Sequence, residues 1–293
     1  MKHFPKTFDK IDAQRKKLSV HLFLKWGREM KMTVRKKRTR VLCVAVSAIV
    51  AVVTAAALVL GSCGGSKIDK TRAEYKAAER EVRAYARENG IDFNKYPDEL
   101  IDLLARNPET EDYVLSYPKY KNKSVSNPNN NGGGEVPLYM QWDKRWGYKK
   151  YSGQVAGLTG CGPTCLSMAA VYLTQNLEFS PAYMMDMAQK NGYTRRGNGS
   201  SWKLISEGAE KIGLVSTELP LDKTRIISAL KKCHPVIIVV GPGDFTSTGH
   251  FLIIREYKNG KFLINDPNSY ENSNKEWDYE RIKGQIRNLW EIS

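Results

Sequence analysis

The order of the hydrophobic patterns between Glu135 and Ser293 constrains the fold more than any other feature of this sequence. Apolar residues recur at helical spacing from Pro163 to Gln175. Further helical segments are predicted over 181–191, 201–212 and 224–232. After residue 232 the pattern changes to short apolar runs typical of buried strands, over 235–240, 251–254 and 261–264. Helices followed by an antiparallel sheet predict an α+β domain.

The turn between the last two predicted strands decides which side chains share a face of the sheet. A two-residue turn at Asn259-Gly260 would pair residues whose numbers sum to 519, and would put His250 and Asp266 on opposite faces. A three-residue loop that includes Lys258 makes the sum 518 and places His250 and Asp266 diagonally on one face, with backbones about 7–8 Å apart. We predict the three-residue loop, with a bulge at Gly260.

The chain before Glu135 divides into four segments by composition. Residues 1–40 hold 14 Lys/Arg and 3 Asp/Glu, so this basic tail carries +11 of the net charge of +15. Residues 41–60 contain no charged side chain, and twenty helical residues span about 30 Å, the thickness of a bilayer core. Residues 61–120 show helical spacing and are interpreted as a helical stalk that packs on itself or on the following domain. Residues 121–134 are an Asn/Gly-rich linker before the domain 135–293.

The apolar run 41–60 has two interpretations. The basic cluster Arg35–Arg40 predicts a cytoplasmic N-terminus, with the run as a single-pass signal anchor in the cell membrane and the domain 135–293 outside the cell. Alternatively, Leu60–Cys63 resembles a bacterial lipobox, which would put a lipid on Cys63 and remove the run. We favour the anchor because the run is long for a signal sequence. Met30 or Met32 could be the true start, in which case residues 1–29 would not belong to the protein.

Charge and ligand chemistry exclude several classes of function. Only +4 of net charge remains for the 253 residues after the tail, so nucleic-acid binding is not expected, although the tail itself could touch anionic lipids. Two histidines, His234 and His250, lie outside the tail, and the cysteines show no CxxC spacing. A metal site is therefore not expected. We expect no cofactor.

Cys161 is the candidate nucleophile. Pro163 suits the first position of a helix, so Cys161 is predicted just before the helix begins, where unpaired N–H groups and the helix dipole favour the thiolate. The alternative is a small buried apolar cysteine. Cys165, one turn into the helix, and Cys233, before a strand, are expected to be structural. With three cysteines after residue 63, at least one thiol stays unpaired or pairs between chains.

Three further side chains could complete a cysteine-nucleophile site. His250 opens an apolar strand after a Gly-rich loop, a setting that suits a general base, although a capping role is the alternative. Asp266 ends the next strand and could orient the histidine, or could simply form a turn before Pro267. Asn265 is the second candidate for that role. As oxyanion donor, Gln141 in a segment of large side chains is favoured over Gln154 in a Gly-rich loop.

These motifs resemble the C39-like peptidase family, a branch of the papain-like cysteine peptidases. The resemblance covers about residues 135–290 and rests on six motifs: Val136–Asp143 with Trp146, Gly160–Thr164, Gly199–Trp202, Pro235–Ile237, Gly249-His250 and Asp266-Pro267. It implies a papain-like fold, with N-terminal helices around a central catalytic helix packed on a C-terminal antiparallel sheet. It also implies that Cys161 is the nucleophile, His250 the base, Asp266 the orienting acid and Gln141 the oxyanion donor.

The resemblance implies a cysteine peptidase that acts on peptides or proteins through a thioacyl intermediate. With the apolar run 41–60, we expect a membrane-anchored bacterial member of the family, and we expect it to be a monomer. Relatives fused to ABC exporters cut leader peptides after a Gly-Gly pair, but no Walker motif occurs here, so that substrate is not carried over. One alternative is a cell-wall peptide amidase or transpeptidase that uses the same three groups. Another is a non-catalytic surface module that binds peptides, against which the intact Cys161, His250 and Asp266 argue.

Overall fold

The computed structural model of the chain describes residues 67–121 and 134–293. The basic tail, the apolar run 41–60, Cys63 and most of the predicted linker lie outside these residues. Among the described residues, no helix has both the length and the apolar character needed to cross a membrane. Residues from Thr71 to Ser293 form one compact unit.

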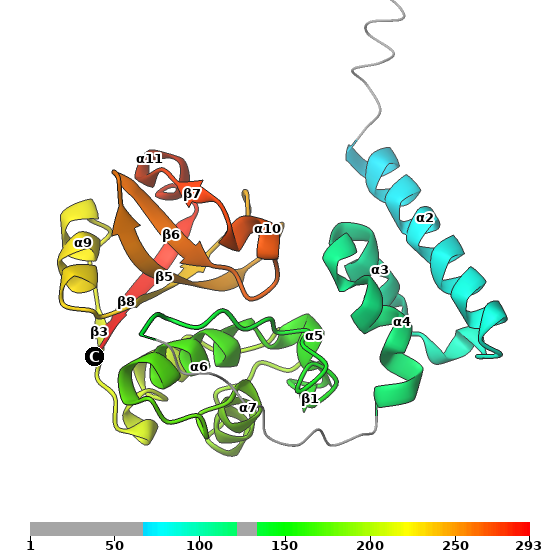
Figure 1. Cartoon of the computed structure of the whole chain (residues 1–293), viewed down its shortest axis with the longest axis horizontal. Helices are drawn as coiled ribbons and strands as arrows, with labels where there is room; N and C mark the ends of the chain where they lie inside the picture. The colour runs from blue at the N-terminus through cyan, green and yellow to red at the C-terminus, as the bar shows by residue number, and fades with distance from the viewer. Residues whose placement is uncertain (1–66, 122–133) are drawn as a thin grey trace, which may run out of the picture. The chain divides into compact units, whose positions relative to one another are not determined.

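A six-stranded antiparallel sheet is the centre of the C-terminal part of the described chain (Figure 1). Its strand order is β3-β8-β4-β5-β6-β7. The bounds are β3 Ser216–Glu218, β4 Val236–Val240, β5 His250–Lys258, β6 Lys261–Asn265, β7 Glu276–Trp277 and β8 Ile286–Ile292. The short strands β1 (Lys150–Tyr151) and β2 (Gln154–Val155) form a separate ribbon.

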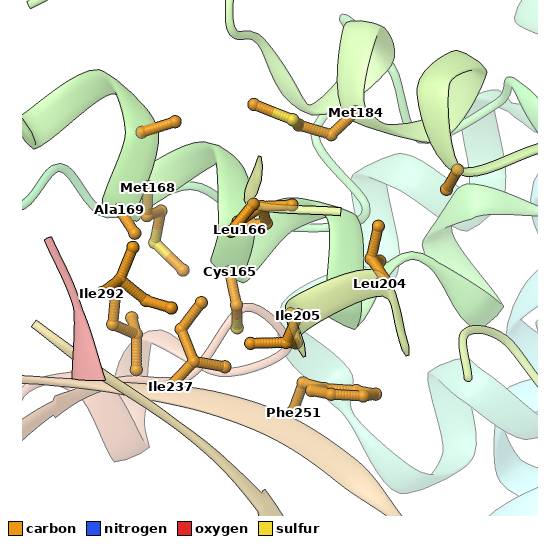
Figure 2. Close-up of a cluster of buried hydrophobic side chains, with 14 of the residues drawn as sticks. Cys165, Leu166, Met168, Ala169, Met184, Leu204, Ile205, Ile237, Phe251 and Ile292 are labelled. Carbon is orange, nitrogen blue, oxygen red and sulfur yellow. The ribbon is translucent and has the colours of Figure 1, made fainter. Parts of the chain in front are cut away.

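Helices cover both faces of this sheet. The helical elements are α5 Ala156–Thr159, α6 Cys161–Thr174, α7 Pro181–Lys190, α8 Lys203–Ser206, the 3-10 helix η3 Glu210–Ile212, α9 Lys223–Lys231, α10 Tyr270–Ser273 and α11 Tyr279–Ile282. Side chains of α6 meet one face of β4, β5 and β8, as Figure 2 shows for Cys165, Ile237 and Phe251. The alternate residues of β4 and β5 face the other side, where Ile226 of α9 and Ile282 of α11 are buried. The predicted α+β class is confirmed.

Helix α6 is buried almost throughout, which explains why its apolar residues are so dense. It lies between the sheet and α7, and every residue from Gly162 to Val171 is buried. At about 25 cal/mol per Å² of apolar surface, such burial is the main contribution that fixes the helix in place. The residues at its N-terminal end are therefore held on a rigid element.

The structure differs from the sequence prediction at several elements. The helix predicted over 201–212 is two short pieces, α8 and η3. They are separated at Gly208, where any Cβ would lie 2.2 Å from the Leu204 carbonyl oxygen. Strand β8, inserted between β3 and β4, was not predicted, because Arg287, Asn288 and Glu291 interrupt its apolar pattern.

The hairpin β5–β6 has the predicted register near its open end but a different turn. Asn259 and Gly260 both have positive φ (51° and 84°), which defines a two-residue turn whose twist matches that of the strands. In the pairs next to this turn, the two residue numbers add up to 519. The extra residue lies at Arg255 instead, between Ile254 and Glu256. On the far side of Arg255 from the turn, the residue numbers of each pair add up to 518, as for Ile253 opposite Asn265. The bulge was thus placed wrongly, but its effect on the face of Asp266 was predicted correctly.

The residues before the linker form a helical segment within the same compact unit. It consists of α2 Lys67–Glu88, the 3-10 helix η1 Phe93–Lys95, α3 Asp98–Arg106, the 3-10 helix η2 Pro108–Thr110 and α4 Glu111–Tyr120. Its buried residues form a third core cluster that includes Tyr148. The ring of Tyr148 stacks on Tyr113 of α4, with centroids 4.5 Å apart. The segment therefore packs on the C-terminal part of the described chain.

Candidate active site

Cys161 is the first residue of α6, and Gly160 is the residue that precedes the helix. The helix therefore begins two residues earlier than predicted. Pro163 is accommodated in the first turn because its missing N–H would have no intrahelical partner there. At Gly162 a Cβ would lie 2.7 Å from the Ser200 hydroxyl oxygen, so this glycine lets the loop around Ser200 approach the start of the helix. The Cys161 side chain is half-buried and a free thiol.

His250 is buried at the start of β5, where it pairs with Val240 at the end of β4. Its Nε2 atom lies 2.7 Å from Asp266 Oδ1, which leaves Nδ1 for the hydrogen bond with the Cys161 side chain. Burial by itself lowers the pKa of His250, but the charge and hydrogen bond of Asp266, together with Cys161, raise this pKa from 6.5 to about 10. The imidazolium form is therefore stabilised.

The surroundings of Cys161 favour its thiolate. Burial raises the pKa of the thiol, but this effect is outweighed by the hydrogen bond and charge of His250. The backbone N–H groups of Phe251 and Gly162 lower the pKa further, and the net pKa lies below the ordinary value. Cys161 and His250 thus form a pair in which each stabilises the charged form of the other.

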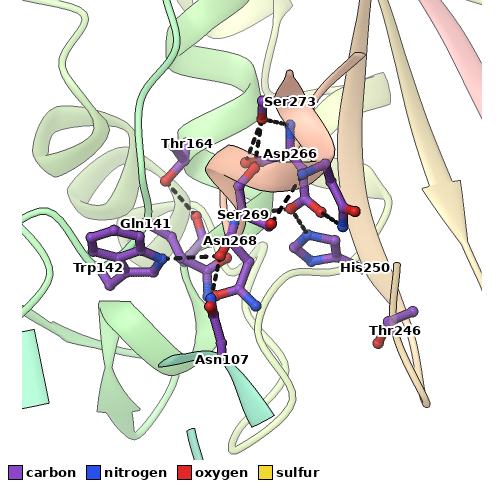
Figure 3. A network of polar contacts seen from close by, with 12 residues as sticks. Asn107, Gln141, Trp142, Thr164, Thr246, His250, Asp266, Asn268, Ser269 and Ser273 are labelled. Carbon is purple, nitrogen blue, oxygen red and sulfur yellow. Dashed lines mark hydrogen bonds and ion pairs between the residues drawn. The ribbon is translucent and has the colours of Figure 1, made fainter. Parts of the chain in front are cut away.

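Asp266 is held by a network of hydrogen bonds (Figure 3). Besides His250, its Oδ1 accepts from the backbone N–H of Asn268 at 2.8 Å, and its Oδ2 accepts from Asn272 Nδ2 at 2.9 Å. Its own backbone N–H donates to Ser273 Oγ at 2.9 Å. With 1% of its surface exposed, the carboxylate has few other orientations open to it. Asp266 both bonds His250 and forms the turn that its position before Pro267 suggested.

Gln141 connects the loop after Asp266 to the short helix before Cys161. Its backbone N–H donates to the Pro267 carbonyl at 2.7 Å, next to Asp266. Its side-chain Nε2 donates to the Gly157 carbonyl at 2.8 Å, in the short helix that precedes Cys161. The amide is buried, with 4% exposed. One N–H of the side-chain amide is thus bonded to Gly157, which leaves the second N–H as the donor that could bind an oxyanion.

The other candidate residues lie elsewhere. Asn265 Nδ2 donates to the Pro137 carbonyl at 3.0 Å instead of to His250, so it does not orient the histidine. Gln154 is half-buried on β2. Cys165 is buried in the core, as predicted, and burial together with the charges of Cys161 and Asp266 raises its pKa well above the ordinary value. Cys233 is exposed, which contradicts the expected structural role; it lies just after α9 with a positive φ of 62°.

Sequence reasoning missed a tyrosine beside the nucleophile. Tyr151 is fully buried, and its hydroxyl lies 2.5 Å from Ser200 Oγ. Burial raises the pKa of Tyr151, the Ser200 hydrogen bond lowers it in part, and the nearby Cys161 raises it again. Gly162 is the sequence signal, since a Cβ there would collide with Ser200, the partner of Tyr151. Among the residues that the structure describes, no group of three His, Cys, Asp or Glu side chains could hold a metal ion.

A thiol on a helix N-terminus, bonded to a buried histidine that is in turn bonded to a third polar side chain, is the arrangement of papain-like cysteine peptidases. The model of the Peptidase_C39 like family matches residues 134–293, more than half of the sequence, and the chain belongs to this family. This membership confirms the predicted family and, with the α+β architecture, the predicted papain-like fold. Comparison with curated proteins gives no match.

Two solved structures are similar to the chain. One is the peptidase domain of Streptococcus ComA, a bifunctional ABC transporter involved in a quorum-sensing pathway, with 21% identity over 54% of this chain and 96% of that domain, and a TM-score of 0.39. The other is a Bacillus anthracis protein described as a C39-like peptidase, with 13% identity over 55% of this chain and 95% of that chain, and a TM-score of 0.39.

Proposed function

We propose that this protein hydrolyses peptide bonds through a Cys161-His250-Asp266 triad. The observation that carries the proposal is the buried hydrogen bond of 2.7 Å between His250 and Asp266, on the face of the hairpin that meets Cys161. The same contacts lower the pKa of Cys161 and raise the pKa of His250 to about 10. Both shifts favour the thiolate–imidazolium pair over the neutral pair, and this is the resting state a cysteine peptidase requires.

The chemistry follows in two acyl transfers. The Cys161 sulfur attacks the scissile carbonyl carbon, and the carbonyl electrons move to oxygen. Gln141 and the backbone N–H of Cys161 donate to this oxyanion, an effect worth about 2.7–4 kcal/mol per donor in comparable sites. His250 gives its proton to the leaving amine, and the C–N bond breaks. Water, deprotonated by His250, then releases the acyl group and restores the thiolate.

A peptide-cleavage assay tests this function. The full-length chain is incubated with a mixture of unrelated peptides and with cell-wall stem peptides, and the products are identified by mass spectrometry. Cleavage by the native chain and none by Cys161→Ala is the expected result. Cleavage of stem peptides alone would replace the peptidase with a cell-wall amidase. No cleavage of any peptide, combined with tight peptide binding, would instead support a non-catalytic peptide-binding module.

We further propose that the protein is anchored in the cell membrane with the catalytic part outside the cell. The support comes from the sequence alone: an uncharged run over 41–60 follows the basic cluster Arg35–Arg40. Protease treatment of intact cells tests the orientation, since a catalytic part outside the cell would be degraded and one inside would survive. Mass spectrometry of the mature chain separates an uncleaved anchor from a lipid on Cys63.

A further inference from the structure

The loop that carries Asp266 is bonded to residues outside the family match. Glu109, in the 3-10 turn η2, accepts the backbone N–H of Tyr270 at Oε2 and that of Glu271 at Oε1, both at 2.8 Å. Asn107 Nδ2 donates to the carbonyl oxygen of Asn268 (Figure 3). Asn107 and Glu109 belong to the N-terminal helical segment, about 160 residues away in sequence. These three bonds therefore connect that segment directly to the acid loop, residues 266–273.

The turn that presents these two side chains is itself well fixed. Asn107 Oδ1 accepts the backbone N–H of Glu109 at 3.2 Å, so its amide is held at one end while its other end reaches Asn268. Pro108 occupies the first position of η2, which pre-sets the backbone there. Thr110 is buried, and its hydroxyl donates to the Asn107 carbonyl at 2.7 Å. The turn thus offers a carboxylate and an amide in a fixed geometry.

Short paths of hydrogen bonds lead from this turn to the catalytic histidine. Glu109 binds the first two amides of α10, and Asn272 and Ser273 at the other end of α10 bond Asp266. Asn107 shares the Asn268 carbonyl with the indole N–H of Trp142, which donates to it at 3.1 Å. The N–H of the same Asn268 bonds Asp266 Oδ1, the oxygen that accepts from His250. Two hydrogen bonds therefore connect Asn107 to the Asp266 carboxylate through Asn268. For Glu109, one hydrogen bond leads to the start of α10 and a second leads from the end of α10 to Asp266.

The same helical segment also touches the opposite side of the site. Tyr113 of α4 donates its hydroxyl to the Gly147 carbonyl at 2.7 Å. Its ring lies so close to Gly157 that a Cβ there would be 2.4 Å from the hydroxyl oxygen. The carbonyl of Gly157 is the acceptor that fixes the Gln141 amide. One segment thus supports both the acid loop and the residues around the oxyanion donor.

We propose that the N-terminal helical segment is a positioning part of the active site, with Asn107 and Glu109 as positioning residues that act through the acid loop on Asp266 and His250. The inference rests on the proposed function. In this account the segment holds the carboxylate where it best stabilises the His250 imidazolium, which in turn stabilises the Cys161 thiolate. Loosening the turn makes the thiolate form at higher pH, without any change in the residues that touch substrate.

The experiment follows alkylation of Cys161 by iodoacetamide across pH in the full-length chain, with site-resolved mass spectrometry. The variants are Glu109→Gln, which keeps one acceptor oxygen, Glu109→Ala, which keeps none, and Asn107→Asp, which keeps the cap of η2 but loses the donor. The matched control is Asp112→Asn, which removes the 2.6 Å ion pair with Lys144 between the same two parts of the molecule. Among the residues that the structure describes, neither Asp112 nor Lys144 bonds the acid loop, so the control loosens the attachment of the segment without touching that loop.

We expect alkylation near pH 6 to slow by about three- to tenfold in Glu109→Ala and Asn107→Asp and by less in Glu109→Gln, the range for losing a helix cap or a side-chain hydrogen bond. The rise of the rate with pH should move to higher pH in each. Asp112→Asn should match the native chain. In an Asp266→Asn background Glu109→Ala should have no further effect, because the path then ends at a neutral amide.

The outcomes separate this inference from the proposed function. Alkylation of native Cys161 that is unchanged by His250→Ala would overturn the proposed triad. A His250-dependent native rate, with Glu109→Ala and Asp112→Asn behaving alike, would overturn the positioning role and leave the triad in place. Lower melting temperatures in the Glu109 and Asn107 variants with an unchanged pH profile would likewise reduce the segment to a structural support.

Discussion

Two ends of strand β4 each bring together a cysteine, a histidine and a carboxylate, and the comparison shows what makes one of them a candidate active site. At one end His250 lies 2.7 Å from Asp266, and at the other His234 Nδ1 lies 2.7 Å from Glu291. The two histidine–carboxylate contacts have the same length. The pairs differ in burial, since His250 is 8% exposed and the His234 side chain 28%.

The two cysteines differ even more than the histidines. Cys161 starts a fourteen-residue helix and is bonded to His250, so helix and imidazolium both favour its thiolate. Cys233 is exposed in a left-handed turn, and its side chain contacts the hydroxyl of Tyr172. A histidine paired with a carboxylate therefore does not define a site by itself. The thiol must lie on the helix end that the pair faces.

The largest predicted effect contrasts the two histidines. His250→Ala should lower peptide hydrolysis by at least about 10³-fold, because the base and the proton donor are both lost. His234→Ala should leave the rate within about twofold of the native value. Initial rates on one cleaved peptide measure both. Equal losses in the two variants would mean that the histidines matter only for folding, and the contrast between the ends of β4 would be lost.

The carboxylates provide the second contrast. Asp266→Asn keeps the shape of the side chain but removes the charge that holds the His250 imidazolium, so kcat should fall by about 10²–10⁴-fold. Glu291→Gln should change kcat little and cost about 1 kcal/mol of unfolding free energy or less, since its partners Lys232 and His234 are partly exposed. Steady-state kinetics and urea unfolding measure these two effects. A Glu291→Gln variant with the larger loss of kcat would reverse the assignment.

Gln141 and Gln154 form the third pair. Gln141→Ala should lower kcat by about 10²-fold with KM nearly unchanged, because its N–H is needed in the transition state. Gln154→Ala, on the ribbon strand β2, should keep both constants. A rise in KM alone for Gln141→Ala would show a role in binding substrate instead of stabilising the oxyanion.

The pH dependence has the smallest but most specific signature. Hydrolysis should rise with pH through the lowered pKa of Cys161 and fall again as pH rises through about 10, where His250 loses its proton. Because the folded-state pKa of His250 lies above its unfolded value of 6.5, its stabilising contribution is complete below pH 6.5 and is lost toward pH 10. In His250→Ala the acid limb of Cys161 alkylation should move to higher pH. An unmoved acid limb would contradict the thiolate–imidazolium pair.

The sequence predicted the elements that carry the strongest periodic patterns. The apolar spacing after Cys161 located α6 within two residues. The predicted strand register, in which paired residue numbers add up to 518, put Asp266 on the same face as His250. Both succeed because burial on one face enforces a single period. The bulge at Arg255 could not be located, since any position between the turn and the site shifts the register equally.

The support of the triad could not be predicted from the sequence. Asn272 and Ser273 reach Asp266 only because α10 folds back on the strand end, and no periodic pattern marks a four-residue helix. Asn107 and Glu109 act across 161 residues through backbone groups, which leave no trace in side-chain chemistry. Such contacts depend on tertiary packing, and the N-terminal helices were therefore interpreted as a stalk.

We propose that placement, and not exposure, makes a thiol reactive in this molecule. The most direct test is competitive labelling of the full-length chain with a limiting electrophilic thiol probe near pH 6, with the modified cysteines identified by mass spectrometry. Half-buried Cys161 should be labelled well before exposed Cys233, and its advantage should vanish in His250→Ala. Preferential labelling of Cys233, or a Cys161 rate that does not depend on His250, would contradict the account.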